Sequence, residues 1–186
     1  MAENSAAENK NAKKATGVAK AMREIRIGKV TLNMGCGGDK AKMEKAGKLL
    51  TMLTDRKPIA TLSKRRSTFG TTKGKPVGMK VTLRGKQAED MLRLALTGVE
   101  NKLKSGQFDK SGNFSFGIKE YIDMSDVKYS HEIGMLGFDV TVTLERPGFC
   151  IKKRGIRQSE IGGGHKITPE EAMQWLREKF GVQIAE

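Results

Sequence analysis

Basic and hydroxyl side chains gather in one stretch of the sequence. This stretch contains no acidic residue, and its basic residues are Lys64, Arg65, Arg66, Lys73, Lys75 and Lys80. A solvated protein surface normally mixes charges of both signs. Thr71, Thr72 and Thr82 add hydroxyl groups, which can bond to phosphates and to ribose 2′-hydroxyls. The stretch therefore predicts an RNA-binding surface that contacts the backbone and the grooves more than the faces of splayed bases.

Two weaker patterns suggest other chemistry. The run Gly35-Cys36-Gly37-Gly38-Asp39-Lys40 follows a predicted strand, but Lys40 replaces the third glycine of a dinucleotide-binding loop, and the sequence has no P-loop motif. Cys36 could act as a nucleophile with His131 or His165 as its base, although neither histidine lies in a motif. A small enzyme acting on RNA or a nucleotide is thus the alternative to a non-catalytic RNA-binding scaffold. A general chromatin-like DNA-binding protein is a third possibility.

Composition supports a polyanionic partner. The 186 residues include 35 Lys and Arg against 21 Asp and Glu, a formal net charge of +14, which favours nucleic acid as the partner. No stretch reaches the roughly 20 apolar residues of a membrane helix, and the N-terminus lacks the apolar core of a secretory signal. We therefore expect a cytoplasmic protein without a membrane partner. Cys36 and Cys150 show no metal-ligand spacing, so we expect no metal or cofactor and two reduced, at least partly buried thiols.

The N-terminal third predicts a tail, a strand and a helix. Residues 1–22 are polar and basic and predict a tail that is disordered or becomes ordered on RNA, which leaves residues 23–186 as one domain. Apolar residues then alternate from Ile25 to Met34 and change phase near Gly28, which indicates a strand. Asp39 can cap a following helix that ends before Pro58.

The middle of the chain predicts a hairpin followed by a helix. Residues 59–64 and 77–84 resemble two strands joined by a long polar loop. Because side chains alternate along a strand, Lys80, Thr82 and Arg84 share the face opposite to the apolar residues of the second strand. A helix over residues 86–99 should pack beside the first one.

The last third predicts two half-buried strands, a basic loop and a helix. Apolar residues alternate over 114–118 and 138–144. The segment 146–159 has five basic residues and no acidic one, and its Pro and Gly residues favour an irregular loop. Thr168 begins a capping box for a final helix that Gly181 ends. The fold class is therefore α+β, with an antiparallel sheet and helices gathered on one face.

Several segments resemble the universal large-subunit ribosomal protein L-five family, over roughly residues 22–182. The resemblance rests on these segments in order: VTLNMG from Val30, Lys57-Pro58, GKPVGMKVTLRG from Gly74, Phe108-Asp109, GNFSFGIKE from Gly112, and GFDV from Gly137. The basic segment after Leu144 and the helix from Thr168 are similar to the archaeal and eukaryotic branch of the family. Neither these two segments nor the tail takes a role from the shared motifs.

The resemblance implies a five-stranded antiparallel sheet and binding to 5S ribosomal RNA, which the protein would help anchor in the central protuberance beside 23S ribosomal RNA and other proteins there. It implies 5S contacts by residues of the strands that look RNA-facing, namely Asn33, Lys64, Arg65, Lys80, Thr82 and Arg84. The loop 67–75 would reach the P-site transfer RNA through Thr68, Thr71, Thr72, Lys73 and Lys75. The family also implies an intersubunit bridge with small-subunit ribosomal protein thirteen, whose residues the sequence does not place.

Some of these residues have simpler interpretations. In the basic segment, Lys152, Lys153, Arg154 and Arg157 are candidates for other ribosomal RNA contacts by charge alone. Asn33 could instead satisfy backbone groups at a strand end, and Arg84 could pair with Glu89 of the following helix. Gly74 and Gly78 could serve turn geometry.

Overall fold

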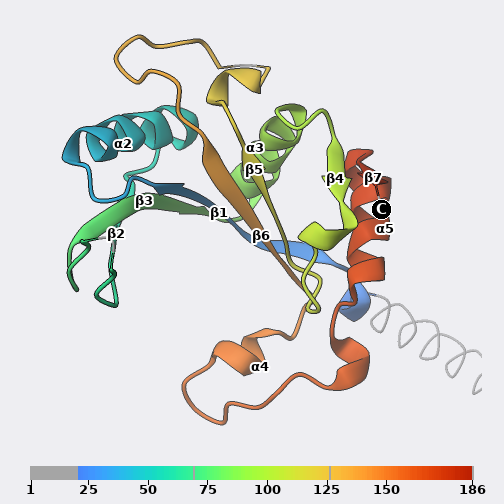
Figure 1. The fold of residues 1–186 in the computed structure, drawn as a ribbon. Coiled ribbons are helices and arrows are strands. Elements are labelled where there is room, and N and C mark those ends of the chain that lie inside the picture. Colours follow the sequence, from blue (N-terminus) through green and yellow to red (C-terminus); the bar gives the residue numbers. More distant parts are fainter. Residues whose placement is uncertain (1–20, 69, 126, 186) are drawn as a thin grey trace, which may run out of the picture.

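The computed structural model describes residues 21–68, 70–125 and 127–185. Residues 1–20 of the expected tail lie outside the described residues. A five-stranded antiparallel sheet forms the body of the protein, with the strands in the order β2-β3-β1-β6-β5. The strands are β1 (Arg26–Gly35), β2 (Ile59–Leu62), β3 (Pro76–Leu83), β5 (Phe114–Ile118) and β6 (Phe138–Glu145). Figure 1 shows the long strands β1, β3 and β6 crossing the centre of the molecule.

The predicted change of phase near Gly28 is a β-bulge. The pairing of β1 with β6 shifts register between Ile27 and Lys29, so one residue is inserted on β1. Beyond the bulge, β1 alternates strictly, and Val30, Leu32 and Met34 are buried. The sequence pattern therefore predicted both the strand and the position of its irregularity.

Three helices cover the apolar face of the sheet. They are α2 (Lys40–Thr54), α3 (Lys86–Thr97) and α5 (Pro169–Phe180). A Cβ on Gly47 of α2 would lie 3.6 Å from the Met79 side chain of β3, so α2 packs against that strand. The α5 helix lies beside α3, since Arg93 of α3 sits 5.8 Å from the ring of Phe180. The core lies between these helices and the sheet, and the other face of the sheet stays open.

The predicted helix starts have the expected caps. The Asp39 side chain accepts a hydrogen bond from the backbone N–H of Ala41 at the start of α2. At α5, Thr168 and Glu171 form both bonds of a capping box, and Gly181 ends the helix in the left-handed conformation, at φ 66°. These local signals are strong because a cap satisfies backbone groups that the helix itself leaves unpaired.

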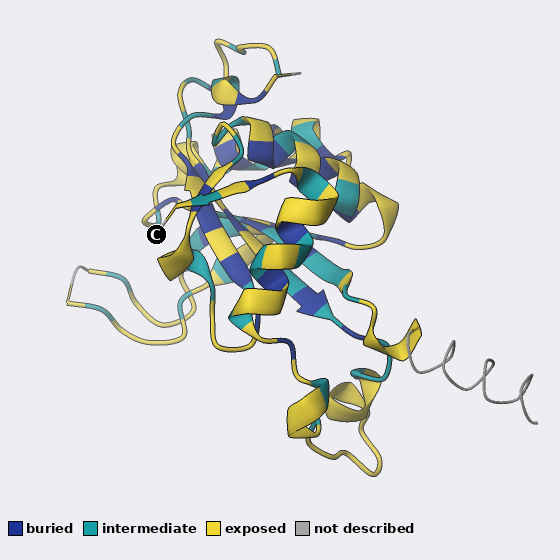
Figure 2. Cartoon of the chain, turned by 90° about the vertical axis from the view of Figure 1, so that its right-hand side faces the viewer, coloured by how far each residue is buried: buried dark blue, intermediate teal, exposed yellow. Residues whose placement is uncertain are grey.

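The segment after β6 differs from the expected irregular loop. It contains one helical turn, α4 (Cys150–Lys153), and a 3-10 turn, η3 (Gly163–His165). We call residues 147–167 the basic lobe, which projects from the body and is mostly exposed (Figures 1 and 2). Cys150 at the start of α4 is exposed, so the expectation that both thiols are partly buried is correct for Cys36 only.

A second, two-stranded sheet was not predicted. The strands β4 (Lys102–Lys104) and β7 (Gln183–Ala185) pair in parallel. Two further 3-10 turns, η1 (Ser105–Gln107) and η2 (Tyr121–Asp123), complete the fold. The small sheet fixes the chain after α5 against the chain after α3. None of the helices in the described part of the chain is long and apolar enough to cross a membrane.

Candidate nucleic-acid interface

The open face of the five-stranded sheet carries short polar side chains in cross-strand rows. Thr31 of β1 lies between Thr82 of β3 and Thr141 of β6, and Thr141 in turn pairs with Ser115 of β5. Four hydroxyl residues therefore form one row across four strands. On β1, β3, β5 and β6 the open face comprises Lys29, Thr31, Asn33, Lys80, Thr82, Ser115, Gly117, Asp139, Thr141 and Thr143, together with Arg84 directly after β3. On β2, the exposed Ile59 pairs with Lys80 and so lies on the same face.

A neighbouring row gives the open face a charge gradient. Asn33 lies between Lys80 of β3 and Asp139 of β6 in the register of the sheet. Lys80 and Arg84 are both exposed on the β3 side. A negatively charged ligand is therefore attracted to the β3 side of the face and meets hydroxyl groups towards β5.

The side chains of Asn33 and Arg84 are available for a ligand. Among the described residues, none forms a hydrogen bond with the Asn33 side chain or an ion pair with Arg84, so the two simpler interpretations of these residues are not seen. Glu89, the expected partner of Arg84, instead lies 3.6 Å from Lys179 of α5. Gly78 is not a turn residue, because it lies within β3, and a Cβ there would be 2.4 Å from the Met34 carbonyl oxygen.

The structure also brings basic residues of the β2–β3 connection to this side of the sheet. Lys64, Lys73 and Lys80 line one open hollow of about 550 Å³, together with residues of β2. Arg65 is exposed beside Lys64. Cations that are 16 positions apart in the sequence thus face a shared space at the edge of the open face.

The loop 67–75 projects from this hairpin. Its base is closed by backbone bonds, because Ser63 donates to Lys75 and accepts from Gly74, both at 2.9 Å. Four of the predicted contact residues of the loop are exposed, namely Thr68, Thr72, Lys73 and Lys75, and the fifth, Thr71, is half-buried. Lys75 differs from the rest, since its Cε would lie 3.1 Å from a Cβ on Gly38, so it packs over the glycine-rich turn after β1.

The basic lobe and the loop 67–75 lie at opposite ends of the sheet. The lobe follows the end of β6, whereas the loop precedes the start of β3 (Figure 1). The four predicted contact residues of the lobe are not equivalent. The Lys153 ammonium is paired with the Glu145 carboxylate, and the Arg154 guanidinium donates to the Arg157 carbonyl at 2.8 Å. Lys152 is exposed and makes no ion pair with any described residue.

Arg146, the first basic residue of the segment 146–159, has a structural role. Its side chain is only 7% exposed and donates to Glu171 at 2.9 Å. It also approaches the carbonyl oxygens of His165 and Lys166, at 3.4 Å each. The hydrogen bonds from Thr168, together with the hydrogen bond and charge of the Arg146 guanidinium, hold the pKa of the Glu171 carboxyl below its usual value. Burial acts in the opposite direction. Arg146 therefore fixes the basic lobe to the start of α5.

Among the described residues, no hydrogen bond joins the Cys36 thiol to His131 or His165, as a nucleophile and its base would require. Burial raises the pKa of the Cys36 thiol, which lies 3.9 Å from the Met34 carbonyl oxygen. His165 is held elsewhere, with Nε2 2.9 Å from the Pro147 carbonyl oxygen and its ring against Phe149. Within the described ranges, no group of three or more His, Cys, Asp or Glu side chains could hold a metal ion.

Sequence reasoning missed part of the interface. Thr31, Thr141 and Ser115 complete the hydroxyl row with Thr82, and Lys29 flanks it. Alternation along each strand could have assigned them to the open face. Their alignment into one row depends on the register between strands far apart in the sequence, which alternation does not give.

Comparison with known proteins identifies the family. The model of the ribosomal L5 family C-terminus matches residues 76–175, and that of Ribosomal protein L5 matches residues 20–68. Large ribosomal subunit protein uL5 of Methanosphaera stadtmanae is 43% identical over 164 residues, which cover 88% of this chain and 98% of the relative. The proteins of the same name from Sulfurisphaera tokodaii and Nanoarchaeum equitans are each 44% identical, over 89% and 88% of this chain and 94% and 97% of their own lengths. The chain therefore belongs to the ribosomal protein L5 family, on its archaeal-type branch, a family of structural and non-enzymatic proteins of the ribosome.

Proposed function

We propose that the chain is a structural component of the large ribosomal subunit in the cytoplasm, where its open face binds 5S ribosomal RNA and helps attach it to the central protuberance. The observation that carries the proposal is the cross-strand row of hydroxyl residues Thr82, Thr31, Thr141 and Ser115, flanked by cations on the β3 side. Family membership supports the ribosomal setting.

The open face suits the backbone of a folded RNA. Neighbouring strands lie about 4.8 Å apart, so a row over four strands spans about 14 Å of RNA surface. Short hydroxyl side chains let the RNA approach closely and can bond to phosphates and to 2′-hydroxyls, which the wide, shallow minor groove of A-form RNA displays. Lys80 and Arg84 would neutralise phosphates at one flank and release counterions. Shape and backbone contacts, more than base edges, would then select the RNA.

Other surfaces divide the remaining contacts. The loop 67–75 would touch the backbone of the P-site transfer RNA through Thr71, Thr72 and Lys73, without reading bases because every transfer RNA must be accepted. The basic lobe would make other ribosomal RNA contacts through Lys152, Lys153, Arg154 and Arg157. The chain would also join an intersubunit bridge with small-subunit ribosomal protein thirteen. Residues 1–22 would act as a tail separate from the domain at 23–186.

A salt series of binding to 5S ribosomal RNA tests the proposal, with transfer RNA and duplex DNA as competitors. The test protein carries Thr82→Ala and Arg84→Ala on the open face. The matched control carries Lys45→Ala and Thr51→Ala on the exposed side of α2, and it loses the same charge and the same kind of hydroxyl.

We expect the open-face variant to bind 5S RNA about tenfold more weakly, with a log-log salt slope reduced by about one phosphate contact. The control should bind as the natural protein does. Equal weakening by both variants, or equal competition by all three polyanions, would show that the charge acts generically and would refute a dedicated 5S face.

A further inference from the structure

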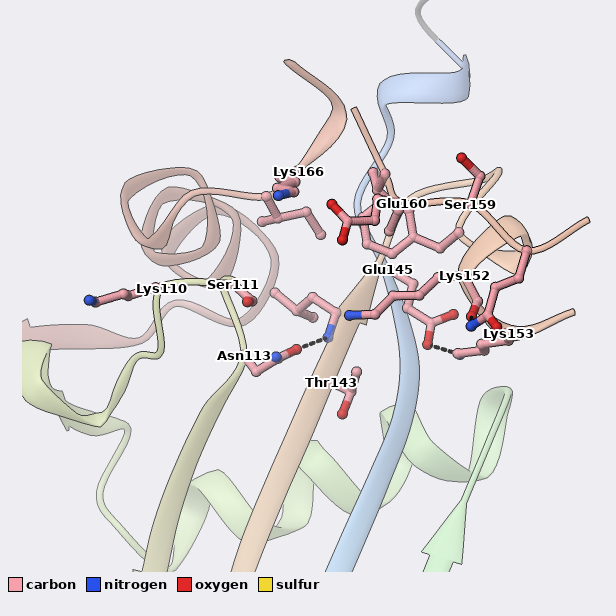
Figure 3. Close-up of a pocket in the computed structure, with 15 residues that line it drawn as sticks. Lys110, Ser111, Asn113, Thr143, Glu145, Lys152, Lys153, Ser159, Glu160 and Lys166 are labelled. Carbon is pink, nitrogen blue, oxygen red and sulfur yellow. Dashed lines mark hydrogen bonds and ion pairs between the residues drawn. The ribbon is translucent and has the colours of Figure 1, made fainter. Parts of the chain in front are cut away.

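A hollow of about 810 Å³ lies where the basic lobe meets the end of β6 (Figure 3). Its wall comes from three parts of the chain: the turn at 110–113, the strand end at 143–145 and the lobe at 149–167. The volume falls within the range of small-molecule sites, about 300 to 1,000 Å³. Neither the family resemblance nor the open-face proposal gives this hollow a role.

The lining combines an apolar wall with hydrogen-bonding groups. The apolar lining residues are Phe149 and Ile161, which are partly exposed, and Leu144 and Ile167, which are buried beneath them in the core. Asn113 uses its Oδ1 to accept from the Leu144 backbone N–H at 3.3 Å, so its amide N–H groups remain to donate to a ligand. Apolar surface beside a few fixed polar groups is the usual composition of a site for an organic ligand.

One cation reaches into the hollow. Figure 3 shows the Lys152 side chain extending across it towards Asn113, whereas the Lys110 side chain points away. No described residue forms an ion pair with Lys152, in contrast to the neighbouring Lys153, which is paired with Glu145. Lys166 adds a cation at the rim, and Glu160 is a lining carboxylate without an ion-pair partner among the described residues. The hollow therefore favours a ligand with a single phosphate over one that carries several.

Contacts within the lobe and at its ends fix the residues that line the hollow. The ion pair of Arg146 with Glu171 fixes one end of the lobe, and His165 contacts the Pro147 carbonyl oxygen. The Gln158 amide donates to the Lys152 carbonyl oxygen and so folds the lobe back on α4. A site that is formed before binding does not have to order these groups when the ligand enters.

The hollow also continues the open face. Thr143 lines the hollow and lies two residues from Thr141 on β6, so both side chains project from the same side of the sheet. Thr143 is also in register with Lys29 of β1. An RNA strand lying on the open face would therefore pass the mouth of the hollow.

We propose that this hollow binds one nucleotide turned out of the ribosomal RNA that the protein contacts. Its phosphate lies against the Lys152 ammonium, and its base stacks on the Phe149 ring beside Ile161. A base that has left its stack exposes a face that an aromatic ring can cover, whichever base it is. The identity of the RNA rests on the proposed function, whereas the binding of a nucleotide by the hollow does not.

The test is a titration of the full chain with small probes, followed in amide NMR spectra. The probes are the four nucleoside 5′-monophosphates, ribose 5-phosphate and inorganic phosphate. The test variant is Lys152→Glu and the matched control is Lys110→Glu, which makes the same charge change at a side chain that points out of the hollow. The spectrum of each variant also reports whether it is folded.

We expect the nucleotides to shift amides of residues 143–145 and 149–167 selectively and to bind more tightly than ribose 5-phosphate, with inorganic phosphate the weakest. Lys152→Glu should weaken nucleotide binding at least tenfold, and Lys110→Glu should leave it within about twofold. Equal affinity for all three classes of probe would indicate an anion site and overturn the proposal. Shifts spread over the whole basic surface, or equal effects of the two variants, would also overturn it. Because these probes do not include 5S RNA, failure here leaves the open-face proposal standing, and failure of the open-face test leaves this one standing.

Discussion

Replacing Arg146 by methionine should destabilise the fold and loosen the basic lobe. Methionine keeps a long apolar stem but removes the guanidinium, which is 7% exposed and bonded to Glu171 at 2.9 Å. It also removes the two contacts to the carbonyl oxygens of His165 and Lys166, at 3.4 Å each. These contacts link the end of β6, the end of the lobe and the start of α5.

The size of the effect follows from the exposure of each group. A charge-assisted hydrogen bond contributes about 1.5 to 3 kcal/mol. The lower end applies here, because Glu171 is 45% exposed and its charge is screened. The long carbonyl contacts add about 0.5 kcal/mol each. Removing Arg146 Nε, which is buried without a partner among the described residues, offsets about 1 kcal/mol. The expected net loss of unfolding free energy is about 1.5 kcal/mol.

Urea denaturation measures this loss. With a denaturant dependence of about 2 kcal/mol per molar, the midpoint should fall by about 0.7 M. The matched control is Lys102→Met, which removes a cation from an exposed pair whose side chains are 62% and 78% exposed. That change should cost less than about 0.5 kcal/mol. A midpoint shift for Arg146→Met no larger than that of the control would refute the structural role of Arg146.

Three further predictions concern the strands, the thiols and the hairpin loop. Gly78→Ala should lower the free energy of unfolding, measured by urea denaturation, by about 1 to 3 kcal/mol, because its Cβ would lie 2.4 Å from the Met34 carbonyl oxygen. Gly35→Ala, at the paired position with nothing within 4 Å, should lower it far less. Equal losses would contradict the close approach at Gly78. Iodoacetamide should label native protein at the exposed Cys150 and spare Cys36, whose burial raises its thiol pKa, and rapid labelling of Cys36 in mass spectra would contradict this packing. Replacing residues 66–72 by two glycines keeps the backbone hydrogen bonds of Ser63 to Gly74 and Lys75. The change should leave the affinity for 5S RNA within about twofold and weaken transfer RNA binding to the P site of reconstituted ribosomes. Equal loss of both would refute the division of RNA contacts between the open face and the loop.

Sequence patterns predicted those elements whose causes are local. The change of phase near Gly28 marked the bulge in β1, and the Thr168 capping box marked the start of α5. Alternation assigned Lys80, Thr82 and Arg84 to the side of β3 that faces away from the core. In each case the signal lies within a few residues of the feature that it predicts.

Features formed by segments that are far apart in the sequence could not be predicted from local patterns. The pairing of β4 with β7 joins strands of three residues each, which β5, β6 and α5 separate in the sequence. Arg146 looked like one more cation of a basic loop, because its partner Glu171 is 25 positions away. Its burial makes it a structural residue instead. The hollow beside Lys152 likewise exists only because three separate segments meet.

The most direct test of the central claim is a lysine footprint on the full chain bound to 5S ribosomal RNA. Lysines are acylated with and without the RNA, and the extent of modification at each site is read by mass spectrometry. Lys80 on the open face and Lys64 at its edge should be protected, while Lys45, which is exposed on α2 across the sheet, should react equally in both samples. Protection of Lys45 with Lys80 left reactive would place the RNA on the helical side and contradict the account.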